Sequence, residues 1–489
     1  MFEIARHDVV ARMRFDNPWW GDKDADTPFL SAPRRRYFPD FLAKVRNTRL
    51  KRAVVLMGPR RVGKTVMVYQ AIGELLKSGV TGQKIFYVSL ETPIYTGLSL
   101  EAMLRMYLED QGIERRETVY IFFDEVQYLK DWEVHLKSLV DSFPDYRFVA
   151  TGSAAAALRM KSQESGAGRF TDFILPPLTF AEYLAFVGKD LSLIDARERE
   201  GGATWTYEAT NIDALNAEFV NYLNYGGYPE AVIVEEIRDD AEQYIKSDII
   251  DKVLLRDLPS LYGISDIQEL NKLFNTLAYN TGNEVNLEGL SKSSGVAKNT
   301  IRRYLEYLEA AFLIRRVDRI DCNARKFKRA MSFKVYLTNP SMRAALFGRV
   351  GPDDEHFGHI VETAIFSQWQ HTVRVDLYYA RWATGEVDIV SLDTRTQKPH
   401  WAVEVKWTDK PCSSNGELNA CVEFIENNKN LFVKEMLVTT RTQRGSVLYK
   451  NCKFRFAPAA EYTYTLGANL LGGSRWNSEE VEPEDLLEE

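Results

Sequence analysis

Cysteines are few in this sequence, and none of them are closely paired. The four residues Cys322, Cys412, Cys421 and Cys452 are scattered along 489 residues without any C-x-x-C pair. This spacing argues against a zinc site and against a disulfide framework. We therefore expect a protein of the reducing cytosol.

Long apolar runs are also absent. The first residues, MFEIARHDVV, contain no apolar signal core, and no run approaches the length of a transmembrane helix. Hydrophobic residues make up 45% of the chain and charged residues 27%, which is typical of a globular protein. The length predicts roughly two to four domains. We expect a cytoplasmic location and no membrane partner.

The chain has no excess of positive charge, since its formal net charge is −7. That value looks unfavourable for nucleic-acid binding, but the end of the chain accounts for all of it. The segment 478–489 carries no base and seven acids, namely Glu479, Glu480, Glu482, Glu484, Asp485, Glu488 and Glu489. The remaining chain is formally neutral, so local basic patches can exist. We interpret residues 461–489 as an acidic, disordered tail.

Short apolar runs alternate with helical stretches between residues 51 and 184. This pattern is typical of a doubly wound α/β domain. Each run is short and almost continuously apolar, as a buried parallel strand requires. The runs are AVVLM at 53–57, KIFYVSL at 84–90, TVYIFF at 118–123, RFVAT at 147–151 and FTDFIL at 170–175. We expect residues 1–50 to form a lead-in packed on this domain.

The first run leads directly into a phosphate-binding motif. Residues 58–65, GPRRVGKT, fit G-x-x-x-x-G-K-[ST] and precede an apparent helix, which is the context that the motif needs. The loop backbone should surround the phosphates with N–H groups, and the helix N-terminus adds a favourable dipole. Lys64 should contact the β- and γ-phosphates, and Thr65 should ligate Mg²⁺. The predicted ATP-binding residues are Gly58, Pro59, Arg60, Arg61, Val62, Gly63, Lys64, Thr65 and Val66.

A second acidic motif follows the third run. In VYIFFDEVQ, residues 119–127, four apolar residues lead into Asp124 and Glu125 at the strand's carboxyl end, where open α/β sheets place their ligands. Asp124 should hold Mg²⁺ through water, and Glu125 should orient and polarise the attacking water. The same pattern could be an ordinary strand that ends in a helix cap, but its position about 60 residues after the loop weakens that alternative.

Two further residues are candidates for ATP hydrolysis. Thr151, Gly152 and Ser153 end the fourth run, and Ser153 is our candidate for sensing the γ-phosphate; a simple turn is an equally good interpretation. Arg169 could stabilise the charge of the transition state, in its own chain or across a homo-oligomer. A solvated surface arginine is as good an interpretation.

These segments resemble successive motifs of a large group of prokaryotic AAA-family ATPases, whose members carry a C-terminal domain long labelled as of unknown function. The motifs are GPRRVGKT, FFDEVQYLKDWE, ATGSAAAAL, GRF, LPPLTFAEYL, YGGYPEAV, LLRDL, GEVDIV and AVEVKW. The resemblance extends from about residue 34 to about residue 440. It implies the strand order 5-1-4-3-2, with an extra strand between the two strands that carry the ATP site.

Residues 285–340 have the pattern of a winged helix. Two apolar helical stripes flank a tight turn at Ser293–Val296, with Gly295 as the helix breaker. The second helix should begin near residue 297 and the basic stretch 315–334 should form a wing that contacts phosphates. A protein-binding module with a solvated basic edge is the alternative. The predicted DNA-binding residues are Lys298, Asn299, Thr300, Arg302, Arg303, Arg325, Lys326 and Lys328.

Residues 341–460 resemble the PD-(D/E)xK nuclease fold, which is restriction-endonuclease-like. The strand WAVEVKW alternates so that Glu404 and Lys406 share a face, and a hairpin would bring Asp388 beside them. Together with Glu362 on a helix, these carboxylates could hold Mg²⁺, and Lys406 could position the hydrolytic water. The motif is short, so a charged fold without catalysis is an equally good interpretation.

The full prediction is an α/β architecture. An AAA-type P-loop ATPase domain with a parallel sheet (51–184) precedes a helical connecting region (185–284), the winged helix and the nuclease-like domain. The leading hypothesis is a Mg²⁺-dependent ATPase, with ATP as cofactor, that binds double-stranded DNA and could cleave it. The alternatives are a nucleotide-dependent switch that senses a partner protein with an inactive nuclease-like fold, and a chaperone-like remodeller.

Overall fold

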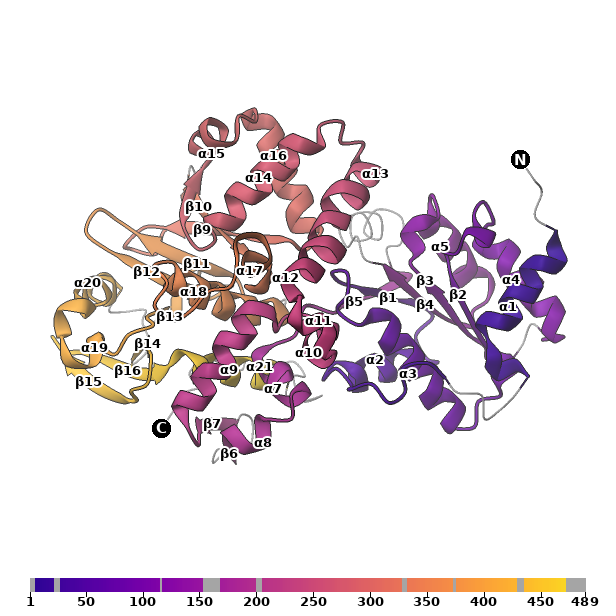
Figure 1. Ribbon diagram of the computed structural model, residues 1–489, viewed down its shortest axis with the longest axis horizontal. Coiled ribbons are helices and arrows are strands. Elements are labelled where there is room, and N and C mark those ends of the chain that lie inside the picture. The colour runs from indigo at the N-terminus through magenta and orange to yellow at the C-terminus, as the bar shows by residue number, and fades with distance from the viewer. Residues whose placement is uncertain are drawn as a thin grey trace. The chain divides into compact units, whose positions relative to one another are not determined.

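The computed structural model describes residues 5–21, 27–114, 117–152, 168–198, 205–327, 332–372, 375–428 and 435–471. The chain divides into two compact units, residues 1–176 and 177–489, which are described separately (Figure 1). Three predicted features lie outside the described residues, namely Ser153, Lys328 and the acidic segment 478–489. Within the described part of the chain, no helix combines the length and apolarity needed to cross a bilayer.

The first unit is built on a five-stranded parallel sheet with helices on both faces (Figure 1). Its strand order is β2-β3-β4-β1-β5, so β4 separates the strand of the phosphate loop from the strand of the acidic motif. This is the order that the family resemblance implied. The strands are β1 (Ala53–Met57), β2 (Ile85–Ser89), β3 (Tyr120–Asp124), β4 (Arg147–Gly152) and β5 (Phe170–Ile174). The helices are α1 (Arg6–Asp16), α2 (Phe38–Arg46), α3 (Lys64–Lys77), α4 (Leu100–Gln111) and α5 (Trp132–Ser142), with short 3₁₀ turns at Pro18–Trp20, Gly82–Lys84, Pro93–Tyr95 and Val126–Tyr128.

The second unit begins with helices, but it also contains a hairpin that the sequence did not predict. Strands β6 (Ile194–Glu198) and β7 (Trp205–Ala209) pair antiparallel inside the expected helical region. The region 185–284 is therefore not wholly helical. The helices here are α7 (Phe180–Phe186), α8 (Asp190–Leu193), α9 (Ile212–Tyr225), α10 (Pro229–Ile233), α11 (Glu235–Asp239), α12 (Ala241–Tyr244), α13 (Leu258–Tyr262) and α14 (Ile267–Tyr279), with π-helical turns at Ile245–Asp251 and Val253–Asp257.

A nine-stranded mixed sheet organises the rest of this unit, in the order β15-β16-β14-β13-β12-β11-β9-β10-β8. The strands are β8 (Glu284–Asn286), β9 (Ile314–Ile320), β10 (Ser332–Leu337), β11 (Leu377–Arg381), β12 (Glu386–Leu392), β13 (Pro399–Glu404), β14 (Met436–Thr440), β15 (Gly445–Tyr449) and β16 (Cys452–Pro458). The helices are α15 (Leu287–Ser294), α16 (Lys298–Ala310), α17 (Ser341–Phe347), α18 (Phe357–Gln368), α19 (Lys410–Ser413), α20 (Asn419–Asn427) and α21 (Ala459–Leu470), with 3₁₀ turns at Trp369–His371 and Asn415–Leu418. The strands of the predicted winged helix and those of the predicted nuclease-like domain thus share one sheet, joined where β9 pairs parallel with β11.

Alternate residues of these strands enter two cores, one on each face of the sheet. One core takes Tyr379, Ile389 and Trp401, and it also contains apolar residues of α7, α9, α18 and α21. The other takes Tyr378 and Ala402 with residues of α20. The predicted tail begins later than expected, because residues 461–469 are buried within α21. This helix is apolar or small around most of its surface, so it can be enclosed on every side.

Candidate functional site: a phosphate loop and a buried carboxylate cluster

The phosphate loop follows β1 and opens α3, as its motif predicted. Gly63 has φ 96° and Arg61 has φ 63°, so the loop turns through the left-handed region just before the helix. Gly58 is required for a different reason, since a Cβ atom there would lie 2.1 Å from the carbonyl oxygen of Leu175. The buried Lys64 ammonium donates hydrogen bonds to the carbonyl oxygens of Gly58 (3.1 Å) and Pro59 (2.7 Å), which holds it over the loop.

Three hydroxyl groups surround the carboxylate of Asp124 at the end of β3. Thr65 Oγ1 and the Tyr87 hydroxyl each donate to Oδ2 at 3.0 Å, and Thr151 Oγ1 donates to Oδ1. The carboxylate is buried, with 2% of its surface exposed. Thr65 and Asp124 thus present adjacent oxygen atoms beside the phosphate loop. Hard oxygen ligands of this kind suit Mg²⁺, so the two residues fit the ion that the motif implies.

Glu125 lies next to this carboxylate in a left-handed backbone conformation, with φ 55°. Its backbone N–H donates to Thr151 Oγ1 at 3.2 Å, and its carboxylate accepts a hydrogen bond from the Gln127 side chain. Burial raises the pKa of Glu125 above its ordinary value, against the opposing charge of Lys64. A carboxylate with a raised pKa beside a phosphate site is suited to accept a proton from water.

The structure separates Arg169 from the phosphate loop of its own chain. The Arg169 carbonyl accepts from the N–H of Ala53, so this residue lies at the amino ends of β5 and β1. The loop follows the carboxyl end of β1, roughly 13 Å away along a strand of this length. Arg169 is instead paired with Asp141. A role in hydrolysis within its own chain is therefore wrong, and a role across subunits stays a prediction.

Two residues of this site were not singled out from the sequence. Tyr87 was counted only as an apolar strand residue, and Thr151 was weighed less than Ser153. Both follow the rule that polar side chains gather at the carboxyl edge of a parallel sheet. Residue type alone could not show that their hydroxyl groups converge on Asp124.

The predicted turn between two helices is present in residues 285–340. Gly295 has φ 78° and separates α15 from α16, and β8 pairs with β10, which pairs with β9. Helix α16 buries its apolar stripe and leaves its predicted DNA-contacting positions at the surface. Of the predicted DNA-binding residues that are described, Lys298, Asn299, Arg302, Arg303, Arg325 and Lys326 are exposed and Thr300 is half-buried.

Several bases of the predicted wing point inward or are paired, which corrects the expectation that they contact phosphates. Arg316 forms an ion pair with Glu309 at 2.6 Å. Arg319 donates to the carbonyl oxygen of Arg381 and lies 3.7 Å from Glu284. Lys334 is buried, with 3% of its side chain exposed. The sequence could not reveal this because β10 extends the larger sheet instead of ending at a free edge.

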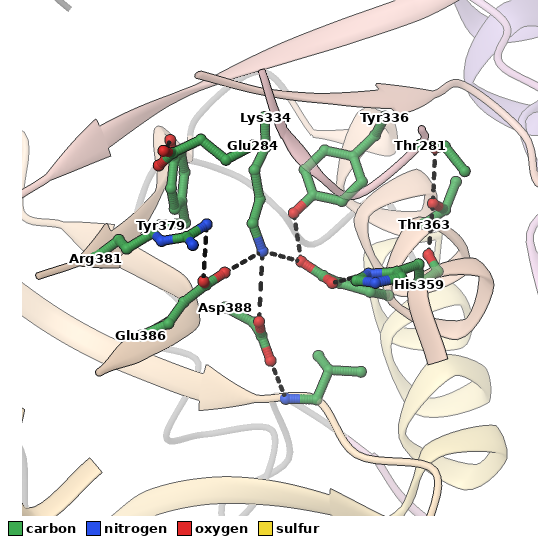
Figure 2. Close-up of polar contacts among 12 residues, drawn as sticks. Thr281, Glu284, Lys334, Tyr336, His359, Thr363, Tyr379, Arg381, Glu386 and Asp388 are labelled. Atoms are coloured by element: carbon green, nitrogen blue, oxygen red, sulfur yellow. Dashed lines mark hydrogen bonds and ion pairs between the residues drawn. The ribbon is translucent and has the colours of Figure 1, made fainter. Parts of the chain in front are cut away.

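Lys334 lies at the centre of a buried carboxylate cluster, shown in Figure 2. Its Nζ atom is 2.8 Å from Glu362 Oε1, 2.6 Å from Glu386 Oε1 and 3.5 Å from Asp388 Oδ1. The Tyr336 hydroxyl also donates to Glu362 Oε1. Burial raises the pKa of Glu362, but Lys334 and a hydrogen bond with His359 outweigh it and lower the pKa to about 2. Glu362 is therefore ionised at neutral pH.

The other two predicted residues, Glu404 and Lys406, contact each other beside Asp388. Lys406 Nζ lies 2.6 Å from Glu404 Oε1, and the N–H of Val405 donates to Asp388 Oδ2 at 2.9 Å. Burial and the nearby Asp388 raise the pKa of Glu404 to about 8, against the effect of Lys406. Within the described chain, Glu404 Oε2 is buried and has no hydrogen-bond partner.

The arrangement does not fit the divalent metal that the nuclease resemblance implies at Glu362, Asp388 and Glu404. In the described ranges, no group of three or more His, Cys, Asp and Glu side chains could hold a metal ion. One oxygen of Glu362 and one of Asp388 face the Lys334 ammonium instead. Sequence reasoning brought the four predicted residues into one region, but it assigned Lys334 to a phosphate-binding wing and omitted Glu386.

Two family profiles match the chain. Residues 50–184 match an AAA domain, and residues 216–353 match a domain of unknown function (DUF8612). Together with the sheet order and the phosphate loop, the first match identifies residues 50–184 as an AAA-type P-loop ATPase domain. The second match crosses from the helical region into residues 285–353, and it assigns no activity.

Proteins similar over much of the chain come from bacteria and archaea. An uncharacterized protein of Haemophilus influenzae is 25% identical over 64% of this chain and 72% of its own length. An uncharacterized protein of Methanocaldococcus jannaschii is 23% identical over 77% of this chain and 80% of its own length. Among solved structures, the Aeropyrum pernix ORC2 protein has TM-score 0.37 and 12% identity, covering 67% of this chain and 95% of that one. The replication initiator DnaA bound to AMPPCP and single-stranded DNA has TM-score 0.27 and 12% identity, covering 56% and 86%.

Proposed function

We propose that this protein is a Mg²⁺-dependent ATPase whose nucleotide turnover is coupled to binding of double-stranded DNA. The contact between Thr65 and Asp124, 3.0 Å long and directly beside the phosphate loop, carries the first half of this proposal. Two hard oxygen ligands would then lie beside the β- and γ-phosphates of a nucleotide bound to the loop. Mg²⁺ bound there would neutralise phosphate charge.

The chain's own groups have distinct tasks in hydrolysis. The loop N–H groups and the α3 N-terminus bind the phosphates. Lys64, now held by two loop carbonyls, can turn its ammonium to the phosphate oxygens. Glu125 orients a water molecule and accepts its proton, which its raised pKa favours. Thr151 ties the Asp124 carboxylate to the backbone of Glu125, because its hydroxyl donates to Asp124 and accepts from the N–H of Glu125.

Two substitutions test the ATPase. Lys64→Ala should abolish ATP binding, because the loop loses its only aliphatic ammonium. Glu125→Gln should bind ATP normally but hydrolyse it about 100-fold more slowly or worse, as loss of a general base predicts. Calorimetry measures ATP binding, and the rate of phosphate release measures hydrolysis, so the two effects are determined separately. Turnover by Glu125→Gln at the wild-type rate would contradict the assigned role of Glu125.

The second half of the proposal concerns residues 285–340. Its support is the element order α14, β8, α15, α16, β9, β10, whose first helix lies before residue 285. Helix α16 also carries exposed bases at Lys298, Arg302 and Arg303. This order and pairing suit a winged helix, whose second helix enters the major groove. The positions of α16 that are predicted to face the groove carry no apolar side chain. They are Lys298, Asn299, Thr300, Arg302 and Arg303.

Salt dependence tests DNA binding directly. Replacing Lys298, Arg302 and Arg303 by alanine should weaken binding to duplex DNA and reduce the slope of log affinity against log salt by about 2 to 3. The matched control replaces Arg395, Lys450 and Lys453, which are also exposed bases of the second unit. DNA-stimulated ATP turnover that Lys64→Ala abolishes would support coupling. An unchanged slope in the first triple variant would contradict DNA binding by α16.

One observation favours a second candidate, a nucleotide-dependent switch that senses a partner protein and carries an inactive nuclease-like fold. Lys334 lies among the carboxylates that a nuclease would use for metal. Mg²⁺-dependent nicking of DNA that survives Lys64→Ala and disappears in Asp388→Ala would instead support cleavage. Absence of nicking with any divalent metal, with or without ATP, would support the switch.

A further inference from the structure

The side chain of Lys334 crosses from the β8–β10 part of the nine-stranded sheet into the region predicted to be a nuclease site. It projects from β10, and its carboxylate partners come from α18 and β12, which follow it by 28 to 54 residues. Figure 2 shows its ammonium group between Glu386 and Asp388, and Glu362 Oε1 lies 2.8 Å from the same Nζ atom. The contact therefore joins the predicted winged helix to the predicted nuclease-like region.

The ammonium group is complementary to its surroundings in the sign of its charge and in its number of donors. It has three N–H donors, and three carboxylates lie within 3.5 Å of its Nζ atom. The ring of Tyr379, whose centroid is 5.3 Å from Nζ, covers another side. A buried cation is tolerated only where it is paired in this way, because an isolated one would lose its hydration without compensation.

We propose that the Lys334 ammonium is the resident cation of this carboxylate cluster and excludes divalent metal from it. A divalent ion that bridged Glu362 and Asp388 would need carboxylate oxygens at about 2.0 to 2.6 Å. Lys334 Nζ already lies against the facing oxygens of both residues. The ion and the ammonium would overlap and repel each other, so only one can occupy this position.

The cluster also holds acceptor capacity that Lys334 does not use. Glu404 Oε2 is buried and, in the part of the chain that the structure describes, has no hydrogen-bond partner. The contact with Lys406 involves only Oε1. Removing the ammonium of Lys334 would leave Glu362, Glu386 and Asp388 without the positive charge that they share. Such a site should then attract a small divalent cation.

Direct measurement of Mn²⁺ binding tests the proposal. The full-length protein, without nucleotide, is titrated with Mn²⁺ as wild type, Lys334→Met and Lys334→Met/Glu362→Gln. The ATP site is unchanged in all three, so differences report the cluster. Lys334→Met should bind one Mn²⁺ more per chain than wild type, and Glu362→Gln in the double variant should remove that additional site. Lys398→Met, which changes an exposed lysine of the connection between β12 and β13, should behave as wild type.

A further pair of proteins decides the question if Lys334→Met does not fold. Wild type and the single variant Glu362→Gln should give the same Mn²⁺ titration, because the wild-type cluster binds none. A wild-type Mn²⁺ site that Glu362→Gln abolishes would overturn the proposal. A folded Lys334→Met protein that gains no site would overturn it as well. Neither result depends on whether the protein hydrolyses ATP or binds DNA.

Discussion

The Tyr87 hydroxyl donates to Oδ2 of Asp124, the same oxygen that Thr65 contacts, and each distance is 3.0 Å. Tyr87→Phe removes this donor and keeps the ring. Asp124 should then be less well oriented toward Mg²⁺, so the Mg²⁺ concentration for half-maximal ATP turnover should rise several-fold. Binding of ATP without Mg²⁺ should stay unchanged. Tyr95→Phe is the control, since its hydroxyl contacts Asp16, outside the site. Equal Mg²⁺ dependence in both variants would contradict this role.

Asp409 illustrates a carboxylate that stabilises a turn. It accepts backbone hydrogen bonds from Arg441, Thr442 and Gln443 at 2.8 to 3.1 Å. Burial tends to raise the pKa of Asp409, but these hydrogen bonds lower it below the ordinary value of 3.8. Its stabilising effect is therefore present above pH 3.8 and is lost as the pH falls through the lower, folded-state pKa.

Asp409→Asn should reduce the free energy of unfolding at pH 7 by about 1 to 2 kcal/mol, because charged acceptors form stronger hydrogen bonds than neutral ones. The difference from wild type should shrink in acid as the wild-type carboxyl group becomes protonated. Urea unfolding between pH 7 and pH 3 measures this. A difference that stays constant over that range would show that charge at Asp409 is unimportant.

At the scale of elements, the edge of the ATPase sheet is closed by side chains of the N-terminal segment. Asn17 donates to the carbonyl of Tyr87 at 2.8 Å and accepts from its N–H at 2.7 Å, as a neighbouring strand would. The indole groups of Trp19 and Trp20 both donate to the carbonyl of Ile85. Strand β2 is therefore not an open edge available for pairing with another chain.

Asn17→Ala tests this arrangement, because the substitution leaves the N–H and carbonyl of Tyr87 buried without partners. We expect a loss of about 2 kcal/mol or more in the free energy of unfolding, from desolvation of these groups. His7→Ala, a change at an exposed position on α1, is the control and should cost less than about 0.5 kcal/mol. Similar unfolding curves for the two variants would contradict the edge-closing role of Asn17.

The elements differ in how well the sequence predicts them. Buried parallel strands leave almost continuous apolar runs, so β1 to β5 are found within one or two residues of their predicted ends. The hairpin β6–β7 was missed because each strand has only five residues, so its alternation of apolar and polar residues is too short to stand out in a region that otherwise has a helical pattern. The role of Lys334 could not be predicted either, because it depends on the parallel pairing of β9 with β11, and nothing local in the sequence encodes that pairing.

At the scale of the whole molecule, the domain boundaries expected at residues 284 and 340 do not coincide with breaks in the second unit. One core contains Val317 and Tyr336 from the predicted winged helix and Ile389 and Trp401 from the predicted nuclease-like region. The sheet is continuous through β9 and β11. Elements that share a core and a sheet tend to unfold together. We therefore expect residues 285–340 and 341–460 to behave as one cooperative unit.

Hydrogen exchange of the full-length chain tests this cooperativity. Trp401 is buried and stacks on Trp369 at 5.0 Å between ring centroids, so Trp401→Ala should cost about 3 to 5 kcal/mol. If the regions unfold together, the amides of β9 and β10 should exchange about 100-fold faster, as should those of β12 and β13. Ile301→Ala, in α16, should produce the reciprocal loss of protection in β12. Amides of β1 and β3 belong to the other unit and should keep their wild-type rates in both variants. Protection of β9 and β10 that survives Trp401→Ala would instead establish the predicted winged helix as an independent folding unit.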